Sequence, residues 1–141
     1  MNPGTLTLVH AAAAWFLTGL IWMVQVVHYP LFARVGAAGY REYQLAHQSL
    51  ISLIVGPAML VEAIAATVLL VQRRDPLTIA GAALLALIWL STALLQVPLH
   101  NALSDGFDPA IHSRLVQTNW IRTVAWTLRA FIALSLLRTT E

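Results

Sequence analysis

The chain contains no cysteine and no lysine, and only 10% of its 141 residues are charged. Without cysteine it forms no disulfide and offers no thiolate to zinc or to an iron–sulfur cluster. It also lacks a phosphate-binding loop, a nucleophile elbow and a dinucleotide fingerprint, so the common nucleotide-dependent and hydrolase chemistries are not indicated. The net charge of +2 comes from dispersed arginines, which gives no basic surface for a nucleic acid.

Charge is missing from two long stretches in particular. No Asp, Glu, Lys or Arg occurs before Arg34, and none lies between Asp75 and Asp105. Hydrophobic residues make up 59% of the chain, and the mean hydropathy is +0.74. Apolar runs of roughly 20 residues suffice for a helix to cross a bilayer, and backbone groups in lipid must be paired internally. We therefore predict an all-α integral membrane four-helix bundle, one domain over 1–141, with spans at about 5–27, 47–71, 77–99 and 112–137. The first span lacks a basic leading region, and we expect it to be a mature helix and no signal peptide.

Four crossings would bring most of the histidines to one membrane face. Both chain termini and the link 72–76 should lie on one side, called side A here, and the links 28–46 and 100–111 on the other, called side B. Four histidines flank the links of side B: His28, His47, His100 and His112. Neutral imidazole is the commonest metal ligand, so these four side chains predict a metal site in which iron or copper is favoured over zinc. Alternatively, each histidine caps a helix or meets water at the interface.

Amide side chains lie near these histidines on the same helical faces. Gln25 and Gln96 are about one turn from His28 and His100, and Asn119 follows His112 on the stripe of the fourth span. We expect the three amides to orient the imidazoles or a bound oxygen species as outer-sphere groups of the metal site.

Three charged residues fall within the hydrocarbon region, where an ionisable side chain costs at least about 2.5 kcal/mol on insertion scales. At a 1.5 Å rise, Glu62 and Arg129 both lie roughly 14 to 16 Å above side A. They should form a buried ion pair, whose role is either to fix helix register or to serve a site. Arg122 has no evident partner, and with Trp126 it is a candidate for substrate binding. Alternatively, the Arg122 side chain points toward side B and reaches water or a backbone carbonyl there.

The two halves of the chain share a short pattern. Ile21-Trp22 precedes Gln25 and His28 in the first span, and Ile88-Trp89 precedes Gln96 and His100 in the third. Such a pattern is compatible with two duplicated helical hairpins, which would place a site on the pseudo-twofold axis between them.

Three tracts of the chain carry a family resemblance: WFLTGLIW (15–22), QVVHYP (25–30) and TNWIRT (118–123). In these tracts the chain resembles a group of small four-helix bacterial membrane proteins. That resemblance implies the four-helix fold and a bacterial inner membrane, but no activity. In size and helix number the chain is also similar to the anthrone-oxygenase-type membrane proteins, whose members oxidise polycyclic phenols; no motif carries their residues across.

Together these patterns predict a metal-dependent oxidoreductase that acts on a lipophilic, phenolic or quinone-like molecule held by Arg122. Two alternatives stay open: a haem-binding electron-transfer protein, with two histidines as axial ligands, and a non-enzymatic membrane carrier or assembly partner. The expected partners are the lipid bilayer and a lipophilic small molecule, and the sequence leaves a homo-oligomer open. Arginines flank both sides almost equally, but the pair Arg73-Arg74 in the short link favours cytoplasmic termini.

Overall fold

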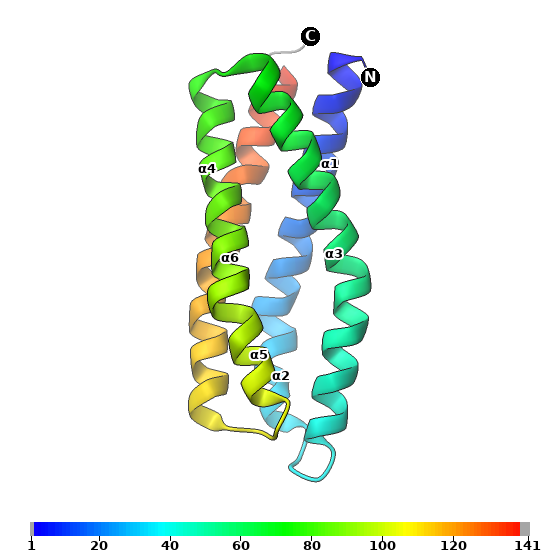
Figure 1. Ribbon diagram of the computed structural model, residues 1–141, viewed down its shortest axis with the longest axis vertical. Helices are drawn as coiled ribbons and strands as arrows, with labels where there is room; N and C mark the ends of the chain where they lie inside the picture. The colour runs from blue at the N-terminus through cyan, green and yellow to red at the C-terminus, as the bar shows by residue number, and fades with distance from the viewer. Residues whose placement is uncertain (1, 139–141) are drawn as a thin grey trace.

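The computed structural model describes residues 2–138 and shows four long helical segments that run up and down in one bundle (Figure 1). No strand occurs in that part of the chain, so the predicted all-α four-helix class is confirmed. The first segment comprises α1 (Pro3–Met23), the π-helix η1 (Val24–His28), α2 (Tyr29–Leu31) and the 3-10 helix η2 (Phe32–Arg34). The others are α3 (Tyr40–Arg73), then α4 (Pro76–Ser91) with the π-helix η3 (Thr92–Gln96) and α5 (Val97–Leu103), and finally α6 (Pro109–Arg138).

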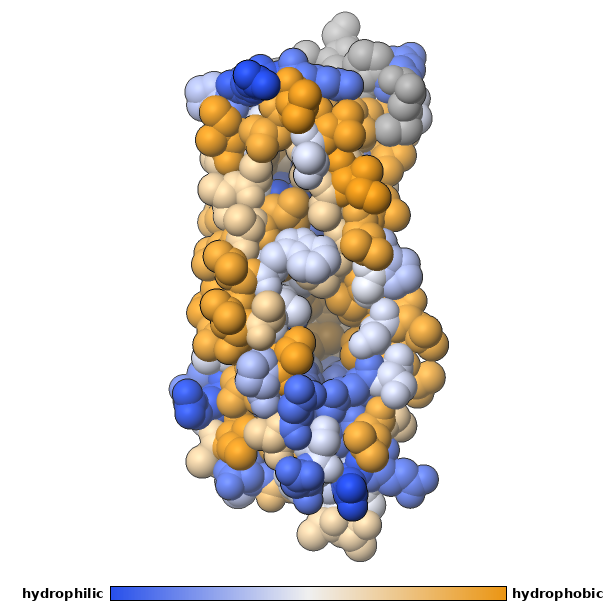
Figure 2. Space-filling model, viewed as in Figure 1, coloured by the Kyte–Doolittle hydropathy of each residue, from blue (hydrophilic) through white to orange (hydrophobic). Residues whose placement is uncertain are grey.

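The outer surface of the bundle is apolar between two polar ends (Figure 2). All four segments are long and apolar enough to cross a membrane. Large side chains such as Leu53, Ile64 and Leu94 are 65–72% exposed, which would be costly in water and is favourable against lipid tails. The surface therefore suits a multi-pass protein in a lipid bilayer.

Both termini and the link between α3 and α4 lie at the same end, as the four-span prediction requires (Figure 1). At side B, however, the predicted boundaries were too short. The first span continues to Arg34, and the fourth begins at Pro109, so the links of side B shrink to 35–39 and 104–108. Asp108 explains one of these differences, because its carboxylate accepts hydrogen bonds from the backbone N–H groups of Ala110 and Ile111 and thereby starts α6 early. The histidines consequently lie inside the helices, about one to two turns from their ends.

Two π-helical turns interrupt the first and third segments at matching places. Each ends two residues before a proline, Pro30 or Pro98. Proline has no N–H to donate to the carbonyl four residues earlier, and the π geometry pairs the preceding N–H with the carbonyl five residues back instead. Such single-turn bulges are frequent at functional sites. Counted from the prolines, His28 corresponds to Gln96 and not to His100, so the two halves repeat a backbone feature and not its side chains.

The buried interior differs between the two halves of the bundle. Toward side A, α1 and α6 pack through small residues, among them Ala11, Ala14 and Ala133, which lets their backbones approach closely. Toward side B the core is built from large side chains, including Leu17, Phe32, Leu115 and Trp126. Two of the four segments in this half carry π turns, and a cavity lies between the helices here.

Candidate functional site

The structure brings three of the four predicted metal ligands together near side B. His28 on η1 and His47 on α3 share a hydrogen bond, with 2.9 Å between Nε2 of the first ring and Nδ1 of the second. The ring of His100 on α5 has its centroid 5.2 Å from that of His47. The three histidines of this cluster therefore come from three separate segments of the bundle, η1, α3 and α5.

His112 is not part of this cluster. Its Nε2 lies 2.8 Å from the backbone carbonyl oxygen of Tyr29. The Phe32 ring contacts the cluster and also His112, with centroid distances of 5.0 Å to His47 and 6.3 Å to His112. An aromatic ring among the four imidazoles, and a backbone partner for the fourth, make a single four-histidine site a poor fit to this arrangement.

Within residues 2–138, no group of three or more His, Asp or Glu side chains has an arrangement that could hold a metal ion. The imidazoles bond to neighbouring protein groups instead of converging on one point. His28 and His47 bond to each other, while the two ring nitrogens of His100 lie 2.8 Å from the Tyr29 hydroxyl oxygen and 2.9 Å from Gln44 Nε2. Metal binding therefore stays a prediction that would need these rings to turn.

The predicted amides surround Arg122 and not the histidines. Gln25 accepts a hydrogen bond of 2.7 Å from Asn119 Nδ2, and Asn119 in turn accepts one of 2.9 Å from Arg122 Nε. Gln96 donates to the Thr118 hydroxyl at 2.9 Å and presents its oxygen to Arg122 at 3.5 Å. The two glutamines come from the π turns, whose extra residue rotates the following helix. The polar groups thus hold a guanidinium in place.

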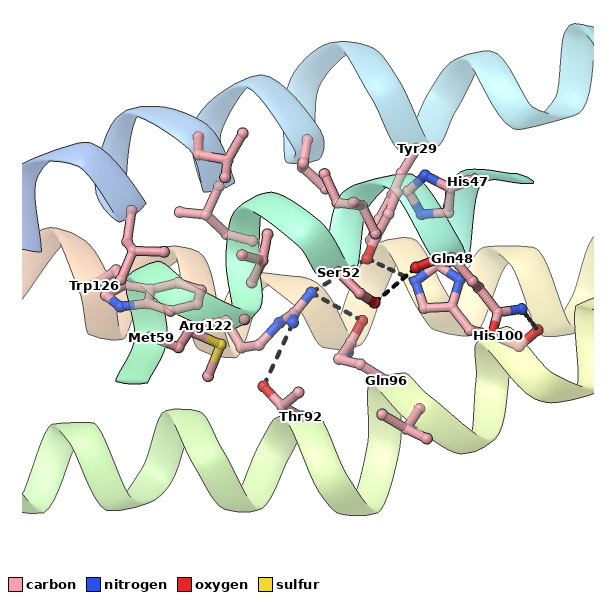
Figure 3. A pocket seen from close by; sticks show the side chains of 18 of the residues that line it. Tyr29, His47, Gln48, Ser52, Met59, Thr92, Gln96, His100, Arg122 and Trp126 are labelled. Atoms are coloured by element: carbon pink, nitrogen blue, oxygen red, sulfur yellow. Dashed lines mark hydrogen bonds between the residues drawn. The ribbon is translucent and has the colours of Figure 1, made fainter. Parts of the chain in front are cut away.

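Arg122 is 7% exposed, and all of its partners are neutral. Besides the amides it donates to the Tyr29 hydroxyl oxygen at 3.2 Å and to the Thr92 hydroxyl at 3.4 Å (Figure 3). In the described part of the chain, the ion pairs are Arg73 with Asp75 and Arg129 with Glu62. No carboxylate there neutralises Arg122.

A cavity of about 290 Å³ adjoins this guanidinium. Most of its wall is apolar, and its polar end is formed by the groups that Figure 3 shows pointing inward. Trp89 and Val97 line it and are also 40% and 48% exposed at the lipid-facing surface, where Figure 2 shows the face hollowed toward side B. The cavity therefore opens sideways toward the bilayer. Its polar lining includes Tyr29, His47, Gln48, Ser52, Thr92, Gln96, His100 and Arg122.

The predicted ion pair of Glu62 and Arg129 is present and is fully buried. Arg129 Nε lies 2.8 Å from Glu62 Oε1, and the two side chains are 1% and 0% exposed. Trp126 Nε1 donates to the other carboxylate oxygen at 3.0 Å while the same residue lines the cavity. Arg129 also donates to the Gly81 carbonyl oxygen and lies 3.2 Å from His10 Nε2. Trp126 thus links the ion pair to the cavity wall.

Two contributors to the site were missed at the sequence level: Tyr29 and Gln44. Tyr29 follows His28 directly, and without the π turn its ring would be assigned to another face. Gln44 precedes His47 by three residues and shares its stripe, which was the one signal available for it. The predicted helix start at 47 excluded it.

Comparisons with models of protein families, with curated proteins and with solved structures give no match to this chain.

Proposed function

We propose that this protein binds a lipophilic small molecule of the quinone or phenol class, with the oxygen of its head group beside Arg122 and its apolar part in the cavity. The observation that carries this proposal is a buried guanidinium with neutral partners at the wall of a cavity. Ligand pockets are typically apolar with a few convergent polar groups, and that description fits this one.

The energetics favour a ligand oxygen at this position. A cation at membrane depth is costly, and protein groups or a ligand must offset the cost. Neutral amides and hydroxyls offset part of it for Arg122, whereas a carboxylate does so for Arg129. A carbonyl or phenolate oxygen would add a hydrogen bond to a charged donor, which contributes about 1.5–3 kcal/mol. Because the cavity opens toward the bilayer, such a molecule would enter from lipid.

The test is a binding titration on the detergent-purified protein with 2-decyl-1,4-benzoquinone, monitored by quenching of tryptophan fluorescence. Trp89 and Trp126 both line the cavity and supply the signal. We expect saturable binding that weakens at least about tenfold in Arg122→Gln. The same change at the exposed Arg114, Arg114→Gln, is the control and should leave binding unchanged. Saturable binding of decylbenzene equal to that of the quinone, or equal affinities in both variants, would refute the proposal.

A second candidate function is metal-dependent oxidation of the bound molecule, with iron or copper held by His28, His47 and His100. The clustering of three imidazoles within ring-contact distance, at the polar end of the cavity, supports it. His112 would take no part, because it lies outside the cluster, where its ring packs against Phe32 and Phe107. In the haem alternative, two of these histidines would be axial ligands.

Elemental analysis and a visible spectrum distinguish these versions. Near-stoichiometric iron or copper that the His47→Ala, His100→Ala double variant loses would support the metal enzyme, and a Soret band would indicate haem. If neither appears after reconstitution and the quinone still binds, the protein is a binding protein or carrier without metal chemistry.

A further inference from the structure

The hydrogen-bond directions around Tyr29 follow from Gln44, which is completely buried on α3. Its side-chain nitrogen lies 3.1 Å from the His100 backbone carbonyl oxygen and 2.9 Å from His100 Nδ1. A carbonyl oxygen only accepts, so the amide nitrogen must face it. A reversed amide would put two oxygens in contact and would leave both N–H donors without partners in the interior, whereas the present orientation leaves the amide oxygen without one. The orientation of Gln44 is thereby fixed.

The Gln44 amide then determines the tautomer of His100. Its two N–H groups point at the His100 carbonyl oxygen and at Nδ1, so Nδ1 has to be a bare acceptor. A neutral imidazole with a bare Nδ1 carries its proton on Nε2. An imidazolium is disfavoured by the same contact, because its Nδ1–H would face the amide N–H. His100 Nε2–H therefore donates to the Tyr29 oxygen, 2.8 Å away.

The Tyr29 oxygen consequently accepts two hydrogen bonds, one from His100 and one from Arg122 at 3.2 Å. Among the described residues no acceptor lies within hydrogen-bond distance of its own proton. The side chain is 3% exposed and lines the cavity. Both donors line the same cavity as the Tyr29 side chain, so the O–H, which has no acceptor among the described protein groups, is available to an acceptor that a ligand brings into this cavity.

The other polar groups beside the guanidinium are already engaged. The Thr92 hydroxyl donates to the Ile88 carbonyl oxygen at 2.8 Å and accepts from Arg122, while the Gln96 amide bonds to Thr118 and Arg122. Next to the positively charged group, this end of the cavity therefore presents the O–H of Tyr29 to a ligand.

We infer that Tyr29 is a specificity-determining residue that donates a hydrogen bond, beside Arg122, to a ligand oxygen that accepts and does not donate. This inference rests on the proposed function. The hydrogen bond from Tyr29 would favour binding of the oxidised, quinone form over the corresponding hydroquinone. A hydroquinone hydroxyl at the same point would have to turn its own proton away from the Tyr29 and Arg122 donors and toward another acceptor, so it would fit less well than a carbonyl oxygen. The preference for the quinone should be about tenfold, the effect of one well-formed hydrogen bond together with one unsatisfied donor.

The first part of the test needs no ligand. In the ¹⁵N NMR spectrum of the wild-type protein labelled at histidine, we expect a protonated Nε2 and a bare Nδ1 for His100, assigned by comparison with His100→Gln. A bare Nε2 on His100 would overturn the inference, because Tyr29 would then donate to the imidazole and not into the cavity.

The second part compares decylbenzoquinone with decylhydroquinone in the wild type, in Tyr29→Phe and in the matched control Tyr43→Phe, which changes a tyrosine outside the cavity lining. Tyr29→Phe should abolish the preference for the quinone and shift the carbonyl stretching frequency of the bound quinone upward. Tyr43→Phe should do neither. A preference that survives in Tyr29→Phe overturns this inference alone, whereas a wild type that binds no quinone refutes the proposed function as well. If Tyr29→Phe does not fold, the NMR result decides.

Discussion

Arg122 and Arg129 lie seven residues apart on one face of α6, both inside the membrane and both at most 7% exposed, yet their surroundings differ. Arg129 has a carboxylate at 2.8 Å and also donates to the backbone carbonyl oxygen of Gly81. Arg122 has amides and hydroxyls and borders a cavity of about 290 Å³. The charge of Arg129 is thus neutralised within the protein, whereas the charge of Arg122 has no carboxylate partner among the described residues.

This difference separates a structural charge from a binding charge. The pocket that Arg129 lines has a volume of about 10 Å³, roughly the space of one water-sized probe. The ion pair and the bond to Gly81 connect three helices, α3, α4 and α6. Near Arg122 a positive charge with neutral partners is stable only because many polar groups share it. An intramembrane charge therefore indicates a site only where its neutralising partner is missing.

The largest effect on stability is expected when the ion-paired Arg129 is replaced by glutamine. Arg129→Gln should lower the free energy of unfolding by about 3–5 kcal/mol, because it leaves the Glu62 carboxylate buried without a cation. Chemical denaturation in detergent micelles measures this. The double variant Arg129→Gln, Glu62→Gln should recover a large part of the loss, and a single variant as stable as the wild type would show that the pair is not structural.

Replacing Arg122, which borders the cavity, by glutamine should weaken quinone binding more than it weakens folding. Arg122→Gln is expected to lower the free energy of unfolding by less than Arg129→Gln does, because no charged partner is stranded and the freed acceptors on Tyr29, Thr92 and Gln96 border the cavity. Its loss of quinone affinity, tenfold or more, is measured in the same preparation. A loss of stability as large as that of Arg129→Gln would make both arginines structural and remove the contrast.

Filling the cavity tests whether the open region is used. Ile51→Trp places a large ring in the cavity lining and should weaken quinone binding about tenfold, since one side chain of this size displaces much of a ligand's apolar contact. Leu53→Trp, two residues away and 72% exposed toward lipid, is the matched control. Equal binding in these two variants would place the ligand elsewhere.

The smallest effect concerns the exposed pair of Arg73 and Asp75, a surface counterpart to the buried pair. Asp75 caps α4, and the bond from the Thr78 backbone N–H, helped by the Thr78 hydroxyl and Arg73, holds the pKa of its carboxyl below the ordinary value of 3.8. Its stabilisation is thus present above that value and is lost as the pH falls through the lowered pKa. Asp75→Ala should cost about 1 kcal/mol at pH 7, and much less in acid, as thermal unfolding at several pH values would show.

The helical periodicity of the sequence predicted the inward face of α6 correctly. Asn119, Arg122, Trp126 and Arg129 are all buried, as their spacing of three and four residues indicated. The pairing of Glu62 with Arg129 also followed from the sequence, since the fixed rise of a helix converts residue counts into depth. Both predictions hold because α3 and α6 are uninterrupted α-helices.

Where the helices are irregular, the same reasoning failed. Gln25 and Gln96 lie within the two π turns, and they support Arg122 and not the histidines for which they were predicted. The longer helices of side B likewise moved the histidines inward and separated His112 from the others by the Phe32 ring.

The sequence by itself determined that the chain has four apolar helices and that Glu62 and Arg129 lie at the same level of the bundle, because hydrophobicity, length and helical rise are local properties. Only the tertiary structure decided which histidines meet, that Arg122 lacks a carboxylate and that a cavity lies beside it. These depend on how each helix is rotated about its axis and on where it bulges, and packing between distant segments sets both.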